Sequence, residues 1–106
     1  MIRAVDCRAS SFIRSLDRIK DQAQQTQVRD AIRSLLMLNL DQAPRALHLH
    51  QLTGKRVASS VRAGAQVAVW TFHITKDDSM KASFTFEDGV AFLRLCGPHD
   101  MIDKNP

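Results

Sequence analysis

The 106-residue chain contains no tyrosine, one tryptophan and only two cysteines, Cys7 and Cys96. Two cysteines without a CxxC spacing make neither a disulfide framework nor a good zinc site, so we expect reduced thiols. No apolar run approaches the roughly 20 residues that a membrane-spanning helix requires. The N-terminal segment MIRAVDCRASS is too polar for a secretory signal. These absences predict a cytoplasmic protein without a membrane partner.

Positive charge is what the chain has in excess. Fifteen lysine and arginine residues stand against eleven aspartate and glutamate residues, which gives a net charge of +4 and a pI near 9.6. Such an excess is compatible with a polyanionic partner, either a nucleic acid or an acidic protein segment. The length predicts one domain, residues 1–106, with one modest hydrophobic core.

Two stretches in the first half of the chain have helical periodicity. Apolar residues recur at helical spacing over residues 12–19, with Ser10 or Ser11 as the expected N-cap. The stretch 28–36 has the stronger pattern, and a glutamine-rich bend over 21–27 is expected before it. The two helices are predicted to form an antiparallel hairpin with one apolar seam.

Strand-like patterns surround these helices. A short strand is expected in residues 1–7, and from Leu47 the pattern alternates, with a turn at Gly54. Hairpins are predicted around residues 63–65 and at Asp88-Gly89. The predicted fold is α+β, with the N-terminal strand and the helical hairpin packed on an antiparallel β-sheet of four to five strands.

The four histidines are candidate metal ligands. His48 and His50 are two residues apart and would share one face of a strand. Paired imidazoles can hold a metal ion, but further ligands would have to come from His73, His99 or carboxylates, and the spacing does not demand this. Surface or core-edge histidines are the favoured interpretation, and no metal site or cofactor is predicted.

Four basic residues lie on or near the predicted strands: Lys55, Arg56, Arg62 and Arg94. Side chains from neighbouring strands can converge into a basic concavity in which arginine grips phosphates bidentately and lysine acts as a point charge. A scattered, solvated face is the equally favoured interpretation. For Trp70, a place in the core is favoured over a base-stacking role.

The pair His99-Asp100 follows the last predicted strand. An imidazole can act as a general acid near neutral pH. In RNA cleavage it would protonate the leaving 5′ oxygen while a nearby arginine stabilises the phosphate. A His-Asp dipeptide alone is a weak indication, because adjacent side chains on an extended chain point in opposite directions.

Five segments follow one another along the chain: SSFIRSLDRI, VRDAIRSLLMLN, ALHLHQLTG, SSVRAGAQVAVW and LRLCGPHDMID. This succession resembles the RelE/ParE superfamily of toxins from bacterial type II toxin–antitoxin systems, over most of the chain. The resemblance implies a helical hairpin on a four-stranded antiparallel sheet. It also implies a cognate antitoxin that wraps the toxin and masks the active concavity.

The resemblance implies two alternative activities. RelE-like members cleave mRNA in the ribosomal A site with the message's own 2′-hydroxyl as nucleophile, whereas ParE-like members poison DNA gyrase. Carried over to this chain, Lys55 and Arg56 would contact the RNA backbone. Arg62 would stabilise the phosphate, and His99 would be the general acid. No metal or organic cofactor is implied.

Two positions depart from the family pattern. Ala68 stands where many relatives have an arginine, and Asp103 stands where they often have a tyrosine. Arg94 is the candidate substitute for the missing arginine. The leading hypothesis is a RelE-like, ribosome-dependent mRNA endonuclease that inhibits translation. The alternative is a protein without nuclease chemistry, either a ParE-like gyrase inhibitor or a degenerate toxin that only binds its antitoxin. A basic α+β domain that merely shares the topology is the third interpretation.

Overall fold

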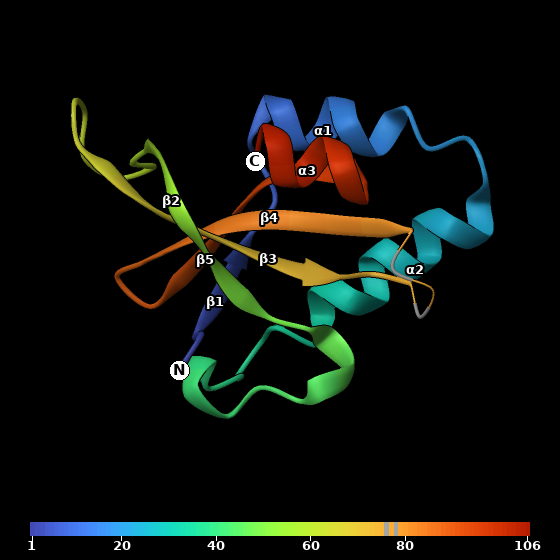
Figure 1. Ribbon diagram of the computed structural model, residues 1–106, viewed down its shortest axis with the longest axis horizontal. Helices are drawn as coiled ribbons and strands as arrows, with labels where there is room; N and C mark the ends of the chain where they lie inside the picture. The colour runs from blue at the N-terminus through green and yellow to red at the C-terminus, as the bar shows by residue number, and fades with distance from the viewer. Residues whose placement is uncertain (76, 78) are drawn as a thin grey trace.

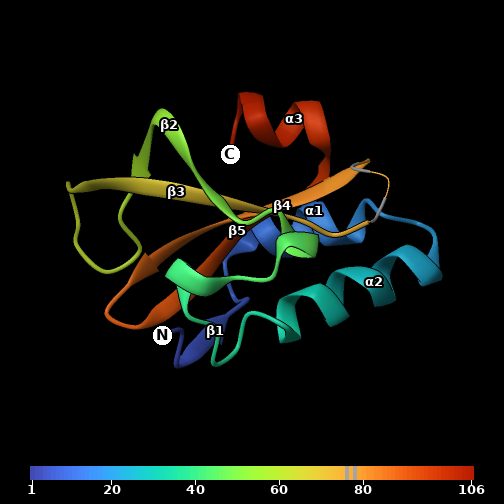
Figure 2. The same ribbon diagram turned by 60° about the horizontal axis from the view of Figure 1, so that its bottom comes forward.

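The structure is a computed structural model that describes residues 1–75, 77 and 79–106. A five-stranded sheet in the order β1-β5-β4-β3-β2 separates α1 and α2 on one face from α3 on the other (Figures 1 and 2). The α+β class is therefore confirmed. The elements are β1 (Ala4–Asp6), α1 (Ser10–Asp17), α2 (Gln22–Arg33), β2 (His50–Ala58), β3 (Gln66–His73), β4 (Met80–Glu87), β5 (Val90–Pro98) and α3 (His99–Lys104), with short 3-10 turns at Leu40–Gln42 and Arg45–Leu47.

The direction of β1 corrects one part of the prediction. Strands β2 to β5 form the expected antiparallel meander, but β1 runs parallel to β5, with Ala4 opposite Val90. The sheet is therefore mixed rather than antiparallel. Parallel neighbours need a crossover connection. Here the two helices and three strands of the meander separate β1 from β5 along the chain.

The core lies between the sheet and the pair α1 and α2. Apolar side chains from both layers are fully or nearly fully buried there, because alternate residues of each strand point to this face. Within the predicted stripe of α2, Val28 and Ile32 are buried as expected, whereas Leu36, beyond the end of the helix, is half exposed. The core includes Phe12, Val28, Ile32, Leu35, Phe72, Phe84, Ala91 and Leu93.

The start of α1 differs from the prediction. Ser10 and Ser11 lie inside the helix, and the N-cap position is Ala9, which makes no side-chain capping bond. The Ser11 hydroxyl instead donates to the Arg94 carbonyl oxygen at 2.9 Å. This bond attaches the first turn of α1 to β5.

The glutamine-rich segment is helical, so the predicted bend is wrong. Helix α2 begins at Gln22, and the Asp21 carboxylate caps it by accepting from the backbone N–H groups of Ala23 and Gln24. Glutamine is a good helix former, and an aspartate N-cap satisfies donors that the first turn leaves free. A polar, glutamine-rich composition is compatible with a loop, but these residues favour a helix once an N-cap precedes them.

The three predicted turns had different outcomes. The hairpin around residues 63–65 is confirmed, since the loop 59–65 connects the antiparallel pair β2 and β3. Asp88 and Gly89 connect β4 and β5 with positive φ angles of 53° and 80°, as a two-residue hairpin turn requires, so this prediction is confirmed. Gly54 lies inside β2 with φ 75°, where the pairing register with β3 shifts between Gln51 and Arg56. It therefore lies at an irregularity within β2 rather than in a turn between two strands.

The C-terminal segment is a short helix, not the extended chain expected after the last strand. Pro98 occupies the N-cap position of α3. Ile102, within this helix, is fully buried on the side that faces the sheet. Within the residues that the structure describes, no helix has the length and apolar character needed to cross a membrane.

Candidate functional site

The sheet face under α3 is polar, in contrast to the face that packs on α1 and α2. On β3 and β4 the residues of one parity form the apolar core, and those of the other parity point to the α3 face. Register places Thr71 opposite Ser83 and His73 opposite Lys81. The buried polar residues on this face are Thr71, His73, Lys81, Ser83 and Thr85. Burying polar groups costs stability unless they are hydrogen-bonded, and a buried polar layer kept despite this cost is a candidate functional site.

His99 is held by a carboxylate one helical turn away. Its Nδ1 atom lies 3.3 Å from Asp103 Oδ2 and 3.4 Å from Asp100 Oδ1. Residues four apart on a helix are neighbours, which is why α3 brings His99 and Asp103 together. A second partner fixes Asp103: Lys81 Nζ lies 2.8 Å from Asp103 Oδ1. The Lys81 side chain is 3% exposed and that of Asp103 is 35% exposed, so the carboxylate joins a buried cation to a half-exposed imidazole.

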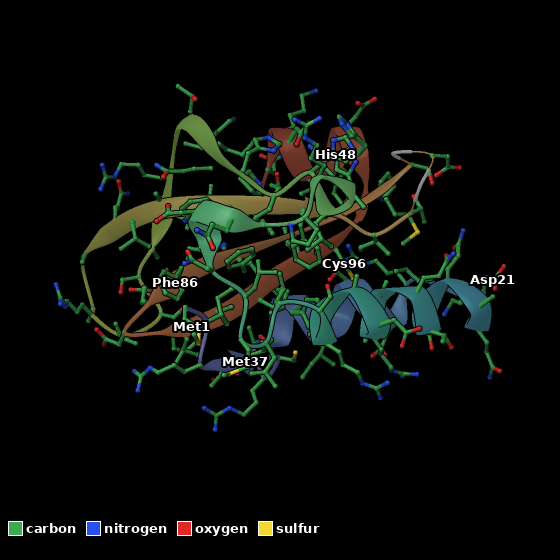
Figure 3. All side chains as sticks on the ribbon, turned by 90° about the horizontal axis from the view of Figure 1, so that it is seen from below. Met1, Asp21, Met37, His48, Phe86 and Cys96 are labelled. Atoms are coloured by element: carbon green, nitrogen blue, oxygen red, sulfur yellow. The ribbon has the colours of Figure 1, made fainter. Side chains whose placement is uncertain are left out.

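Three imidazole rings, including that of His99, lie in contact at this site. The His73 ring stacks on His48 with a centroid distance of 4.4 Å and an interplanar angle of 14°. The same ring meets His99 edge-on at 5.9 Å and 71°. His48, labelled in Figure 3, lies on the same side of the sheet as α3. Strands β2 and β3 and helix α3 thus converge at one end of the sheet.

The spacing predicted that His48 and His50 share one face of a strand, and this prediction is wrong. His48 precedes β2 and adopts the left-handed conformation, with φ 47° and ψ 42°. The His50 ring nitrogen Nδ1 lies 3.0 Å from the His48 carbonyl oxygen. Across the described part of the chain, no three or more His, Cys, Asp or Glu side chains are arranged to hold a metal ion.

The predicted RNA contacts Lys55 and Arg56 point to opposite faces of β2. Lys55 Nζ donates to the Lys104 carbonyl oxygen at 3.1 Å, which places Lys55 against the last turn of α3. Arg56 is paired with Ala68, on the parity that faces α1 and α2, and its Nη2 atom donates to the Gln66 carbonyl oxygen at 3.4 Å. The structure therefore brings Lys55, but not Arg56, to the α3 face.

Arg62 lies in the loop 59–65 after β2, not within a strand as the sequence suggested. Figure 2 shows this loop at the left, away from the start of α3. The loop precedes Gln66 at one end of β3, whereas His99 adjoins His73 at the other end. At roughly 3.3 Å per residue, the length of β3 keeps Arg62 and His99 too far apart to contact one phosphate.

Glu87 anchors the loop that carries Arg62. Its carboxylate accepts from the Ser59 hydroxyl, from the Ser60 backbone N–H at 2.9 Å and from the Thr85 hydroxyl at 3.0 Å. Burial alone would raise the pKa of Glu87, but these hydrogen bonds and the charge of Arg62 lower it below its ordinary value. The loop thus has a fixed attachment at the far end of the sheet.

Arg94 faces the α3 side of the sheet but is engaged there. Its Nε atom donates to the Pro106 carbonyl oxygen at 3.1 Å, and the Ser83 hydroxyl donates to the same oxygen at 3.4 Å. Burial lowers the pKa of the Arg94 guanidinium. Arg94 therefore holds the segment after α3 in place on the sheet.

Sequence reasoning missed Lys81 and His73 as site residues, and it treated Asp103 only as a departure from a family pattern. Residues 99 and 103 meet only if the segment is helical, and Lys81 joins them only when β4 is placed beside β3 in the observed register. The second condition is tertiary and could not be read from the chain.

No family model matches the chain, and no curated protein sequence matches it. Among solved structures it is similar to the crystal structure of a copper-bound mutant toxin from Helicobacter pylori, with a TM-score of 0.53 and 16% identity. The match covers 96% of this chain and 99% of the toxin. The chain shares the fold of that toxin. At this identity the likeness describes the arrangement of helices and strands, and the chemistry has to be argued from this chain's own residues.

Proposed function

We propose that this protein is the toxin of a type II toxin–antitoxin pair and acts as a RelE-like, ribosome-dependent mRNA endonuclease in the cytoplasm. The observation that supports it most is the placement of His99 on the polar face of the sheet, with Asp103 and buried Lys81 behind it. The toxin-like fold and the net charge of +4 agree with this proposal.

His99 would act as the general acid. The message's 2′-oxygen attacks the adjacent phosphorus, the bond from phosphorus to the 5′ oxygen breaks, and His99 protonates that leaving oxygen. The products are a 2′,3′-cyclic phosphate and a 5′-hydroxyl. Asp103 lies beside Nδ1, which leaves Nε2 as the nitrogen that can give its proton to the leaving oxygen. Such an acid contributes about 10²–10⁴-fold to the rate.

The cations take different places in this proposal. Lys55, beside the last turn of α3, would hold a phosphate close to the scissile one. Arg62 would bind the RNA backbone further along, at the opposite end of the sheet, and Arg56 would make a weaker contact from the other face of β2. Arg94 would support the site by holding the C-terminal segment on the sheet.

The test is incubation of the purified protein with programmed ribosomes, with mRNA 5′ ends mapped by primer extension. We expect discrete cuts in the A-site codon, lost in His99→Ala. Arg33→Ala is the matched control, because this exposed residue lies on α2, across the sheet from the site. No cuts from a wild-type protein shown to be folded, or cuts that persist in His99→Ala, would overturn the proposal.

One observation favours the alternative of a protein without nuclease activity. Strand β3 places no arginine on the α3 face, where its residues are Val67, Val69, Thr71 and His73. A gyrase inhibitor or a toxin that only binds its antitoxin needs no cation at that place. Altered plasmid supercoiling after induction, with intact mRNA, would identify the gyrase inhibitor. Copurification of a small acidic partner encoded beside the gene, without either effect, would identify the antitoxin-binding form.

A further inference from the structure

The cleavage proposed above needs a second proton-transfer group, because a base must accept the proton of the attacking 2′-hydroxyl. Asp103 is committed to His99 and Lys81. The nearest imidazoles are His73, which is 8% exposed, and His48, which is exposed to solvent. Since His73 contacts both other rings, His48 and His99 share one buried neighbour. The two accessible imidazoles therefore belong to one cluster, beside which a phosphodiester linkage can lie.

The backbone at His48 indicates that its position is built rather than incidental. Its φ of 47° lies in the left-handed region, which side chains other than glycine adopt infrequently and which often marks functional positions. The His48 N–H donates to the Arg45 carbonyl oxygen at 3.0 Å, and its own carbonyl lies 3.0 Å from His50 Nδ1. These bonds and the stacking on His73 fix the ring beside the site.

The charges around His48 come from four elements. Arg45 and His50 belong to its own segment, His73 is on β3, Lys81 is on β4, and His99, Asp100 and Asp103 are on α3. Lys81 is paired with Asp103, and both aspartates lie beside His99 rather than beside His48. The two rings therefore have different partners: His99 has two carboxylates beside Nδ1, whereas His48 stacks on His73. A general base acts through a neutral imidazole nitrogen, and a general acid through a protonated one.

We propose that His48 is the general base of this site and His99 its general acid, with His73 holding the two rings apart. This inference rests on the proposed endonuclease activity. A neutral His48 nitrogen takes the proton of the 2′-hydroxyl as the bond from the 2′-oxygen to phosphorus forms. As the bond to the 5′ oxygen breaks, protonated His99 gives its proton to that oxygen. His48 then carries the proton that His99 has lost, and exchange with water restores both rings.

A substrate with sulfur in place of the 5′ bridging oxygen separates the two roles. Sulfur leaves as a thiolate and needs no general acid, whereas the 2′-hydroxyl still needs its base. We therefore expect the sulfur substrate to restore cleavage by His99→Ala but not by His48→Asn. Asparagine tolerates the left-handed conformation, so His48→Asn preserves the turn. Its expected loss is about 10²–10⁴-fold on both substrates.

Arg45→Gln is the control, because it changes a charge in the same turn and leaves the three rings intact. Single-turnover cleavage on programmed ribosomes is the measurement, with circular dichroism to verify folding. If the wild type cleaves and a folded His48→Asn variant cleaves equally fast, the role of His48 is overturned while the endonuclease proposal stands. Rescue of His48→Asn by the sulfur substrate would overturn this role too, since His48 would then act on the leaving group. A wild-type protein that cleaves neither substrate would overturn the endonuclease proposal itself, and the role of His48 with it.

Discussion

Removing the carboxylate of Asp103 should destabilise the protein through Lys81. Nearly the whole Lys81 side chain is buried, with 3% exposed, and Asp103 Oδ1 lies 2.8 Å from its ammonium nitrogen. Asp103→Ala leaves that charge in the polar layer beneath α3 without its anion. Removing one member of a buried ion pair costs about 3–5 kcal/mol. Because Asp103 is itself 35% exposed, we expect a loss near the low end, about 3 kcal/mol.

The reverse change should cost much less. Lys81→Met replaces the buried ammonium with an apolar chain of similar length, and the partly exposed Asp103 carboxylate keeps access to water and to His99. Replacing a buried ion pair by apolar residues is often close to neutral. We therefore expect Lys81→Met to lose about 1 kcal/mol or less, and Lys81→Met/Asp103→Ala to be about as stable as Lys81→Met alone.

The assay is equilibrium unfolding in urea for the wild type, both single variants and the double variant, analysed as a double-mutant cycle. Asp103→Ala should lower Tm by about 10–20 °C. Asp100→Ala is the matched control: its carboxylate is fully exposed and also lies beside His99, so its loss should stay below about 1 kcal/mol. A loss under about 1 kcal/mol for Asp103→Ala, or strictly additive variants, would refute the view that Lys81 is a buried charge dependent on Asp103.

Three further predictions concern other parts of the chain. Ser15→Ala should lower the free energy of unfolding in urea by about 1–3 kcal/mol, because the buried Ser15 hydroxyl accepts from the Cys96 N–H at 3.0 Å. Ser34→Ala is the control at an exposed site and should be nearly neutral. Hydrogen bonds lower the pKa of Glu87 in the folded protein. The ionised carboxylate therefore stabilises the fold at pH values above the ordinary pKa of 4.5, and this stabilisation is lost as the pH falls below 4.5. The Tm of the wild type should therefore fall more steeply below pH 4.5 than that of Glu87→Gln, and parallel curves would contradict this. Gly89→Ala should cost slightly more than Gly64→Ala at nearly the same φ, because only at residue 89 would the new Cβ displace the Arg3 guanidinium, which donates to the Asp88 carbonyl oxygen at 2.7 Å. Equal shifts in Tm would show that this hydrogen bond contributes nothing.

The parts of the fold that the sequence predicted correctly are those fixed by local periodicity and turn chemistry. The stripe of α2 and the Asp88-Gly89 hairpin are examples. The parallel pairing of β1 was missed because it depends on a partner more than 80 residues away along the chain. A glycine inside a strand pattern indicates either a turn or a local irregularity of the strand, and Gly54 lies at an irregularity within β2. Helix α3 has only six residues, too few for a periodic signal, so the pairing of His99 with Asp103 was invisible.

The two departures from the toxin pattern have a different meaning once the faces of the sheet are known. Ala68 is on the parity of Trp70 and Phe72, toward α1 and α2, so an arginine at this position would point away from His99. Its absence removes no cation from the α3 face. Asp103, in place of a tyrosine, removes a ring that could stack on a base but adds a carboxylate beside His99 Nδ1. A carboxylate beside Nδ1 orients an imidazole ring and leaves Nε2 to face a substrate. The local geometry at His99 therefore suits proton donation, while the cations that bind phosphate have to be Lys55 and others further along the sheet.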